Sequence, residues 1–425
     1  MASPDALLRH NVRLLRLGGA WPPEHGRGLR RLFPLYTASV YFCQSATIAM
    51  GALLTYELWG DVDAIMLTYV NTFTLLGGFV KLVCFSGDVR GYRALVAQLR
   101  AVARHQWPHC QADAHLMAIF GAAQRAALWL TFGPLAYLNV LGPTWFFMPL
   151  IVRATTGSHQ RLLPFVNMRD SVTEIFPLYV AIYVVQVYCM FYWNIISVGL
   201  DMFFVSCMIH VAAQLRILNE RLSNLGRARA DDDDDSCRAE ANHKNIPGFG
   251  SSQKRSFSRE GRVGNMYEEL RNCIKTHQHI LSLLKTLQRM MSPVAMTQFM
   301  CSASGACITL FQATFNPEGN STLKCLMFLP MPAFQIFIYC WAGHEIVYQE
   351  ELLSLSGYRS GWVGCGRRAS ALLHILMCNA QKPLQLTAGK FYPVNRDTFV
   401  TLINASYTFY TLMRQTRDQG SIVQT

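Results

Sequence analysis

The stretch PLQLTAGKFYPVNRDTFVTLINASYTFYTLMRQTR, residues 383–417, decides the fold because it contains the most clearly bounded helix of the chain. Pro393 cannot continue a helix toward its N-terminal side, and Asn395 just after it is a good N-cap. Asp397 places a negative charge in the first turn, where the helix dipole favours it. No helix-breaking residue follows before the end of the stretch. At about 1.5 Å per residue, this helix is long enough to cross a bilayer core of roughly 30 Å.

Polar side chains recur along this helix at alternating spacings of four and three, which places them on one face. They are Asp397, Thr401, Asn404, Thr408, Thr411 and Gln415, and Leu412 lies among them. A membrane helix has to hide such a stripe against protein or present it to water. Periodicity alone leaves two interpretations open. The stripe either bonds packed helices together, or it lines a pore between several copies, with Leu412 as an apolar gate.

Composition indicates an all-α, polytopic membrane protein. Of the 425 residues, 51% are apolar and 15% are charged, and several apolar runs exceed the roughly 18 residues that a transmembrane helix needs. We predict seven membrane segments, at residues 34–58, 64–86, 122–150, 175–210, 287–315, 323–348 and 395–417.

The formal net charge of +12 lies in the links between apolar runs. Lys and Arg are dense in residues 1–33, in the link after the second segment and in 211–286, and they are sparse in 59–63, 153–174 and 316–322. The positive-inside rule therefore predicts a cytosolic N-terminus, and seven crossings put the C-terminus outside. The sequon Asn320-Ser321-Thr322 lies in a link assigned to the outside, so we expect glycosylation at Asn320.

The predicted organisation follows from these segments. Residues 1–33 form a cytosolic segment whose amphipathic helix, 5–17, either lies on the membrane or packs on the protein itself. Residues 34–210 hold helices one to four, and 211–286 form a cytosolic loop with an unfolded, low-complexity insert at 226–265. Two more spans occupy 287–348. Then come a cytosolic region at 349–394 with a short apolar helix at 369–379, the last span at 395–417, and an extracellular tail at 418–425.

The sequence carries no motif of a catalytic or cofactor site. It has no P-loop, no dinucleotide-binding glycine pattern in a strand–helix context, no HExxH and no GxSxG. The 13 cysteines show no paired framework, so we expect neither disulfides nor a metal site. His277 and His279 lie near Cys273, but residues two apart do not share a helix face. We therefore expect a solvated cytosolic helix there. For the whole chain, we expect no enzyme activity, no cofactor and no bound metal.

Three stretches resemble the C-terminal signature of insect odorant receptors. They are HEIVYQEELLSLSGYRSGW (344–362), QKPLQLTAGKFYPVNRDTF (381–399) and ASYTFYTLMRQ (405–415). The resemblance is strong over 340–416, looser in the upstream apolar segments and absent from 226–265. It implies an odorant-tuning subunit of a tetrameric, non-selective cation channel in the plasma membrane of an olfactory sensory neuron. It also implies the common odorant receptor coreceptor as partner and a small volatile organic molecule as ligand. We expect no nucleic acid as partner, because the positive-inside rule already explains the basic charge of the links.

The resemblance changes the interpretation of the polar stripe, because in this family the last helix lines the pore. Leu412 matches the position of the hydrophobic gate, and the pore set becomes Leu412, Gln415, Thr411, Thr408, Asn404 and Thr401. Arg414 departs from the usual apolar residue near the gate, and we expect it to reach the outer interface. The region 349–394 and the cytosolic ends of the fourth to sixth spans would anchor the four subunits together.

The family places its ligand pocket in the outer halves of the second to sixth spans. An enclosed apolar pocket with one or two polar contacts would suit a volatile ligand. The candidate pocket residues are Tyr69, Phe73, Leu138, Leu141, Trp145, Tyr183, Gln186, Ile308 and Phe311. Ordinary packing or lipid contact is the competing explanation for each of them.

Two other classes of multi-span membrane protein predict features that this sequence lacks. A G-protein-coupled receptor should have its N-terminus outside, an acidic-Arg-aromatic triplet after the third span and NPxxY in the seventh. The charge pattern contradicts the first, and the sequence lacks both motifs. A secondary transporter should show internal repeats and paired broken helices, and neither is visible. The G-protein-coupled chemoreceptor remains the alternative.

Overall fold

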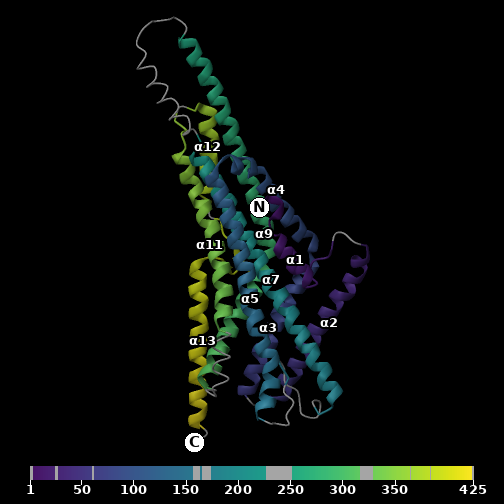
Figure 1. The fold of residues 1–425 in the computed structure, drawn as a ribbon. Coiled ribbons are helices and arrows are strands. Elements are labelled where there is room, and N and C mark those ends of the chain that lie inside the picture. The colour runs from purple at the N-terminus through teal and green to yellow at the C-terminus, as the bar shows by residue number, and fades with distance from the viewer. Residues whose placement is uncertain are drawn as a thin grey trace.

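The structure is a computed structural model that describes residues 3–23, 27–59, 62–156, 163–164, 174–225, 251–315, 329–363, 365–382 and 384–423. It is a bundle of long helices with one short hairpin (Figure 1). The elements are η1 (Pro4–Ala6), α1 (Arg9–Leu17), α2 (Arg27–Glu57), α3 (Val62–Gly87), α4 (Val89–Ala112), α5 (Ala114–Thr156), α7 (Phe176–Ser223), α9 (Ser251–Phe315), α11 (Pro330–Arg359), α12 (Arg367–Ala380), β1 (Thr387–Ala388), β2 (Tyr392–Pro393) and α13 (Arg396–Val423).

The prediction of an all-α chain is confirmed, and each of the seven predicted membrane segments falls on one helix: α2, α3, α5, α7, α9, α11 or α13. Within the described residues, five of these are apolar enough over a long enough window to cross a membrane on their own, namely α2, α3, α5, α7 and α9. The helices α11 and α13 are long but more polar. Their polar side chains therefore need protein or water rather than lipid beside them.

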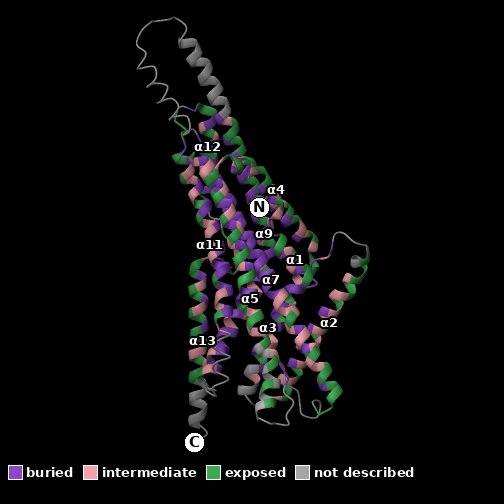
Figure 2. Ribbon diagram, viewed as in Figure 1, coloured by how far each residue is buried: buried purple, intermediate pink, exposed green. Residues whose placement is uncertain are grey.

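The helix α7 forms the centre of the bundle. From Ile196 to Leu218 almost every residue is buried, and α7 packs on α1, α2, α3, α4, α5, α9 and α11 (Figure 2). Its Phe203 and Phe204 meet a cluster of aromatic rings in which Tyr92 lies 4.2 Å from Phe85, measured between centroids. An all-round apolar helix is stable only when it is surrounded by other elements.

The N-terminal helix packs on the protein itself. Leu7, Leu8 and Leu15 are buried, and the Asn11 amide donates to Thr131 Oγ1 at 3.0 Å and to Ser206 Oγ at 3.2 Å. Of the two placements that the sequence left open, the structure has the apolar side of α1 on the core rather than on lipid.

Some sequence predictions differ from the structure, and others concern residues that the structure does not describe. Residues 251–265, predicted as part of an unfolded insert, belong to α9, and no proline interrupts this stretch. The helix α4 replaces a predicted basic link. Residues 226–250 and the sequon at Asn320 lie outside the described residues.

Candidate functional site

A two-stranded hairpin positions the start of α13. The strands β1 and β2 are antiparallel, with Thr387 opposite Pro393. Gly389 and Lys390 at the turn have φ of 61° and 66°, and a Cβ on Gly389 would lie 2.7 Å from Met296 on α9. Glycine is needed there for both its conformation and its size.

The same hairpin is hydrogen-bonded to α9. The Gln288 amide donates to the Thr387 carbonyl oxygen and accepts from the Thr387 N–H, both at 2.9 Å. The Gly389 N–H donates to the Ser292 carbonyl at 3.1 Å. These bonds fix the entry to α13 on the side of α9.

The predicted N-cap of the last helix is confirmed. The Asn395 Oδ1 accepts from the Thr398 N–H at 2.9 Å. Just before it, Val394 is buried against α11, where a Cβ on Gly343 would lie 2.4 Å from the Val394 carbonyl oxygen. The start of α13 therefore cannot move without disturbing α11.

One side of α13 packs on the bundle. Thr398, Leu402 and Ser406 are buried, and the Tyr410 hydroxyl lies 3.0 Å from Thr314 Oγ1 on α9. Figure 1 shows α13 along the outside of the bundle beside α11. At 100° per residue, the predicted stripe points away from this packed side.

We call that outward side of α13 the polar face. Its members Thr401, Asn404, Thr408 and Gln415 are exposed, Thr411 is half-buried and Leu412 is 57% exposed. The threonine hydroxyls donate to carbonyls of the same helix at 2.8–2.9 Å. Their protons are thus engaged, and their oxygen lone pairs remain as acceptors. Such a face suits water and cations better than lipid.

A cavity of about 50 Å³ lies inside the bundle, between α3, α5, α7, α9 and α11. It is lined by Thr74, Gly77, Gly78, Leu138, Trp193, Ser197, Val198, Gln298, Cys301, Ser302, Gly305, Met331, Pro332 and Gln335. The lining is mainly apolar or glycine, with a few hydroxyl and amide groups, as in typical small-molecule sites.

A buried ion pair lies against this cavity. The Lys81 ammonium on α3 contacts the two carboxylate oxygens of Asp201 on α7 at 2.9 and 2.8 Å, and both side chains are at most 1% exposed. Lys81 also donates to Ser197 Oγ at 3.3 Å and to Gln298 Oε1.

The pair extends into a hydrogen-bonded network across four helices. The Asp201 carboxylate accepts from Tyr339 at 3.1 Å and from Gln335 at 3.2 Å, both on α11. The Gln298 amide on α9 donates to Gln335 and to Ser302, each at 2.7 Å. We call these residues together the Lys81–Asp201 network. Burial of two charges is tolerated only because each finds several partners.

The structure brings one predicted ligand residue, Leu138, into the cavity lining. Tyr69 and Phe73 stack on each other at 5.4 Å, with Tyr69 42% exposed, and the Tyr183 hydroxyl donates to the Phe146 carbonyl. The other predicted positions do not line this cavity. Gln186, Ile308 and Phe311 are buried elsewhere, Leu141 is half-buried, and the side chain of Trp145 lies outside the described residues.

Sequence reasoning missed the polar residues at the cavity, although a signal was present. Lys81 and Asp201 are isolated charges in the apolar runs 64–86 and 175–210. An ionisable residue inside a membrane segment marks a functional or paired site by default. What the sequence does not say is that these two positions face each other.

A second buried polar pair joins α9 and α11. His277 Nε2 lies 2.7 Å from Glu350 Oε1, and both side chains are under 5% exposed. The expectation of a solvated helix here was wrong, because Cys273 and His277 pack inward against the neighbouring helices. On the adjacent α4, burial and then the charge of Arg221 lower the pKa of His105, which favours its neutral form.

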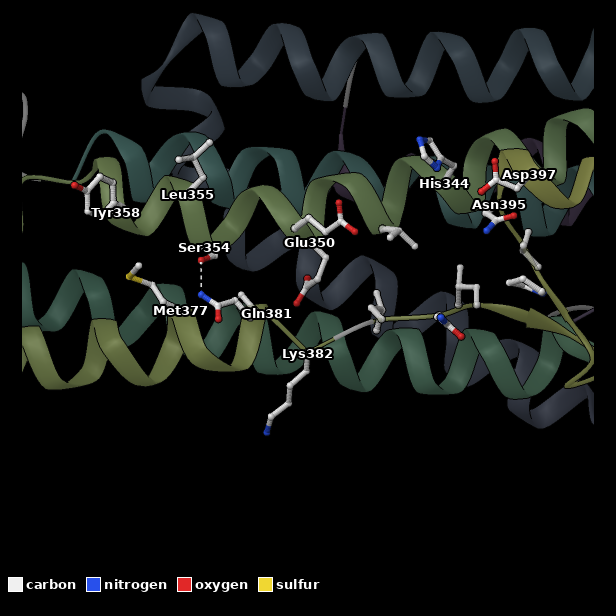
Figure 3. A pocket seen from close by; sticks show the side chains of 18 residues that line it. His344, Glu350, Ser354, Leu355, Tyr358, Met377, Gln381, Lys382, Asn395 and Asp397 are labelled. Atoms are coloured by element: carbon white, nitrogen blue, oxygen red, sulfur yellow. Dashed lines mark hydrogen bonds between the residues drawn. The ribbon is translucent and has the colours of Figure 1, made fainter.

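Glu350 also borders a groove of about 800 Å³ between α11, α12, the hairpin and the start of α13 (Figure 3). Gln381 Nε2 donates a hydrogen bond to Ser354 Oγ across the groove at 3.3 Å, and the side chain of Lys382 extends away from the groove. His344, Glu351 and Asp397 also line it. The described residues hold no cluster of three or more His, Cys, Asp or Glu side chains able to bind a metal ion.

Comparison with known proteins agrees with this architecture. A family model described as 7tm Odorant receptor matches residues 61–407. The chain is 22% identical to Odorant receptor Or2 of Anopheles gambiae over 56% of this chain and 57% of that receptor. It is 19% identical to Odorant receptor 10 of Aedes albopictus over 84% of this chain and 86% of that receptor.

The fold is similar to that of a solved structure, the insect olfactory receptor OR5 from Machilis hrabei in complex with eugenol. The TM-score is 0.75 at 17% sequence identity, and the match covers 96% of this chain and 97% of that one. The same receptor without eugenol gives a TM-score of 0.75. All these proteins are receptors, so the prediction that the chain is not an enzyme is confirmed.

Proposed function

The chain belongs to the 7tm odorant receptor family, and we propose that it is a subunit of a non-selective cation channel opened by a small volatile ligand. The observation that carries this proposal is the polar face of α13. A helix that exposes threonine and asparagine along one side of a membrane bundle needs a water-filled or protein-filled space there.

Four copies of α13 around an axis would create that space. The hydroxyl and amide oxygens of Thr401, Asn404, Thr408 and Gln415 would then face permeating cations, with Thr411 at the edge of the lumen. Leu412 is the one large apolar side chain among them, and a ring of four would close the pore by excluding water.

The ligand site in this proposal is the cavity that includes Leu138, Trp193 and Ser302. The remaining predicted positions, Tyr69, Phe73, Leu141, Trp145, Tyr183, Gln186, Ile308 and Phe311, would form its outer surroundings and entry.

The helix α9 supports the coupling of ligand to gate, because it takes part in both sites. Ser302 and Gly305 line the cavity, Gln288 holds the hairpin, and Thr314 lies 3.0 Å from Tyr410 of α13. A ligand that binds better when α9 has shifted would favour the shifted position of α13.

The proposed assembly is a heterotetramer with the odorant receptor coreceptor in the plasma membrane of an olfactory sensory neuron. The exposed side of α13 supports an assembly, since it includes apolar Val400 and Tyr407 as well as the polar face. The proposed orientation has the N-terminus in the cytosol, residues 349–394 at the cytosolic anchor and Asn320 outside, as the Lys and Arg distribution favours.

The test is whole-cell voltage clamp of cells that express the chain with an insect coreceptor, with G-protein signalling blocked. A current that needs both chains and survives the block is expected. Leu412→Ala should raise the resting current. Leu53→Ala is the matched control, since Leu53 is 61% exposed but lies on α2 rather than on α13. Loss of the response under the block would instead indicate the G-protein-coupled class.

A further inference from the structure

Most polar groups that line the cavity already form hydrogen bonds within the protein. Thr74 Oγ1 donates to the Val70 carbonyl at 2.6 Å, and Trp193 Nε1 donates to the Thr74 carbonyl at 3.1 Å. The Gln298 amide has its oxygen on Lys81, and its nitrogen donates to Ser302 and Gln335. These groups have little capacity left for a ligand.

Two serine hydroxyls are different. Ser197 Oγ accepts from Lys81, and Ser302 Oγ accepts from Gln298. Across the part of the chain that the structure describes, neither hydroxyl donates to a carbonyl, unlike Ser304, which donates to the Met300 carbonyl at 2.8 Å. Each serine proton is therefore available inside the cavity.

The Lys81–Asp201 network strengthens these donors. A hydroxyl that accepts a hydrogen bond becomes a better donor itself, and the effect is larger when the first donor carries a charge. Ser197 accepts directly from the Lys81 ammonium, and Ser302 is one step further along the chain of bonds through Gln298.

Size restricts the ligand as well. The cavity holds about 50 Å³, whereas a drug-sized ligand needs roughly 300 Å³ or more. The remaining lining, which includes Leu138, Val198, Met331 and Pro332, is apolar. A compact, mostly apolar molecule with one polar group fits this description.

We propose that the cavity selects compact, uncharged volatile ligands that carry a hydrogen-bond acceptor, namely a ketone, aldehyde or ester carbonyl, held by the hydroxyls of Ser197 and Ser302. This inference rests on the proposed function, in which this cavity is the ligand site. A primary amine of the same size is excluded, because its protonated form would place a second positive charge near Lys81.

The test compares carbonyl compounds of three to five carbons with the alkane and the primary amine of matched skeleton. Channel current with the coreceptor and the melting temperature of the purified chain are both measured. Carbonyl compounds should act at concentrations roughly tenfold lower than the matched alkanes, and amines should not act. Ser302→Ala should reduce the carbonyl preference by about three- to tenfold, the value of one hydrogen bond. Ser304→Ala is the matched control and should leave it unchanged.

A second variant leaves the network untouched. A Cβ on Gly305 meets no atom within 4 Å, so Gly305→Ala adds a methyl group inside the cavity without a clash. It should weaken all ligands, while Gly133→Ala, whose Cβ also meets nothing within 4 Å, should not. Equal potency of alkanes and carbonyl compounds overturns the inference, as does a panel in which no carbonyl compound changes current or melting temperature. The proposed function fails separately, if Leu412→Ala and coexpression leave every current unchanged.

Discussion

The substitution Lys81→Met tests whether the Lys81–Asp201 network holds the bundle together. Methionine has a similar length and keeps the apolar packing of the stem, but it removes the ammonium. Asp201 loses contacts of 2.9 and 2.8 Å and retains the bonds from Tyr339 and Gln335. A carboxylate then remains in the interior with no counter-charge on any described residue in contact with it.

The expected loss in the free energy of unfolding is large because both partners are at most 1% exposed. Removing one member of a buried pair costs about 3–5 kcal/mol, since the other charge stays buried. At about 2 °C per kcal/mol for a large domain, the melting temperature falls by roughly 6–10 °C. The double variant Lys81→Met/Asp201→Asn removes both charges and keeps an acceptor for Tyr339. It should recover more than half of the loss.

A thiol-reactive dye offers a direct assay, because unfolding exposes buried thiols such as those of Cys189 and Cys207. The purified chain is heated in detergent and the dye signal is followed. Arg104→Met is the control, since Arg104 and Asp5 form an exposed pair whose loss should barely matter. A drop of under about 2 °C for Lys81→Met, or a double variant no more stable than the single one, would refute the reasoning.

Two further predictions concern the start of α13 and the α9–α11 contact. Gly343→Ala places a Cβ 2.4 Å from the Val394 carbonyl oxygen. The resulting overpacking costs about 1–3 kcal/mol and should shift α13, which alters the resting current. Gly121→Ala is the control: its Cβ meets nothing within 4 Å, so the resting current should not change. His277→Ala leaves Glu350 without its 2.7 Å partner and should cost about 1.5–3 kcal/mol, seen as a lower melting temperature that His277→Gln largely restores.

Local sequence signals were enough for most of the fold. The Asn395 cap was visible because a cap depends on residues only three apart. The helix α4 was missed because its arginines resemble a basic link, although its buried residues repeat with the spacing of a helix. They are Tyr92, Leu95, Val96, Leu99, Val102, Ala103, Gln106 and Cys110.

The candidate site was less predictable because it depends on how helices are rotated against each other. Gly77 and Gly78 let α3 come so close that a Cβ on them would lie 2.3 Å from Cys301 and 2.2 Å from Trp193. Nothing within the run 64–86 indicates those partners. Leu138 was found because the family resemblance assigns the outer half of the third span to the pocket. Ser197 and Ser302 look like ordinary small residues in an apolar helix.

The free energy of the proposed hydrogen bond is small compared with the free energy needed to open the proposed gate. One neutral hydrogen bond contributes about 1 kcal/mol, or roughly a fivefold preference. A ligand shifts the closed–open equilibrium only by the difference in its affinity for the two states, and a shift from 1:99 to 99:1 needs about 5.5 kcal/mol. A single bond to Ser302 therefore cannot open the channel by itself. This bond can discriminate between ligands of the same size. The rest of the affinity difference between the closed and open states would come from apolar contacts with Leu138 and Met331, repeated in each subunit that binds ligand. In the proposed mechanism, selectivity and opening then reside in different groups of the same cavity, and α9 transmits the effect of the ligand to α13.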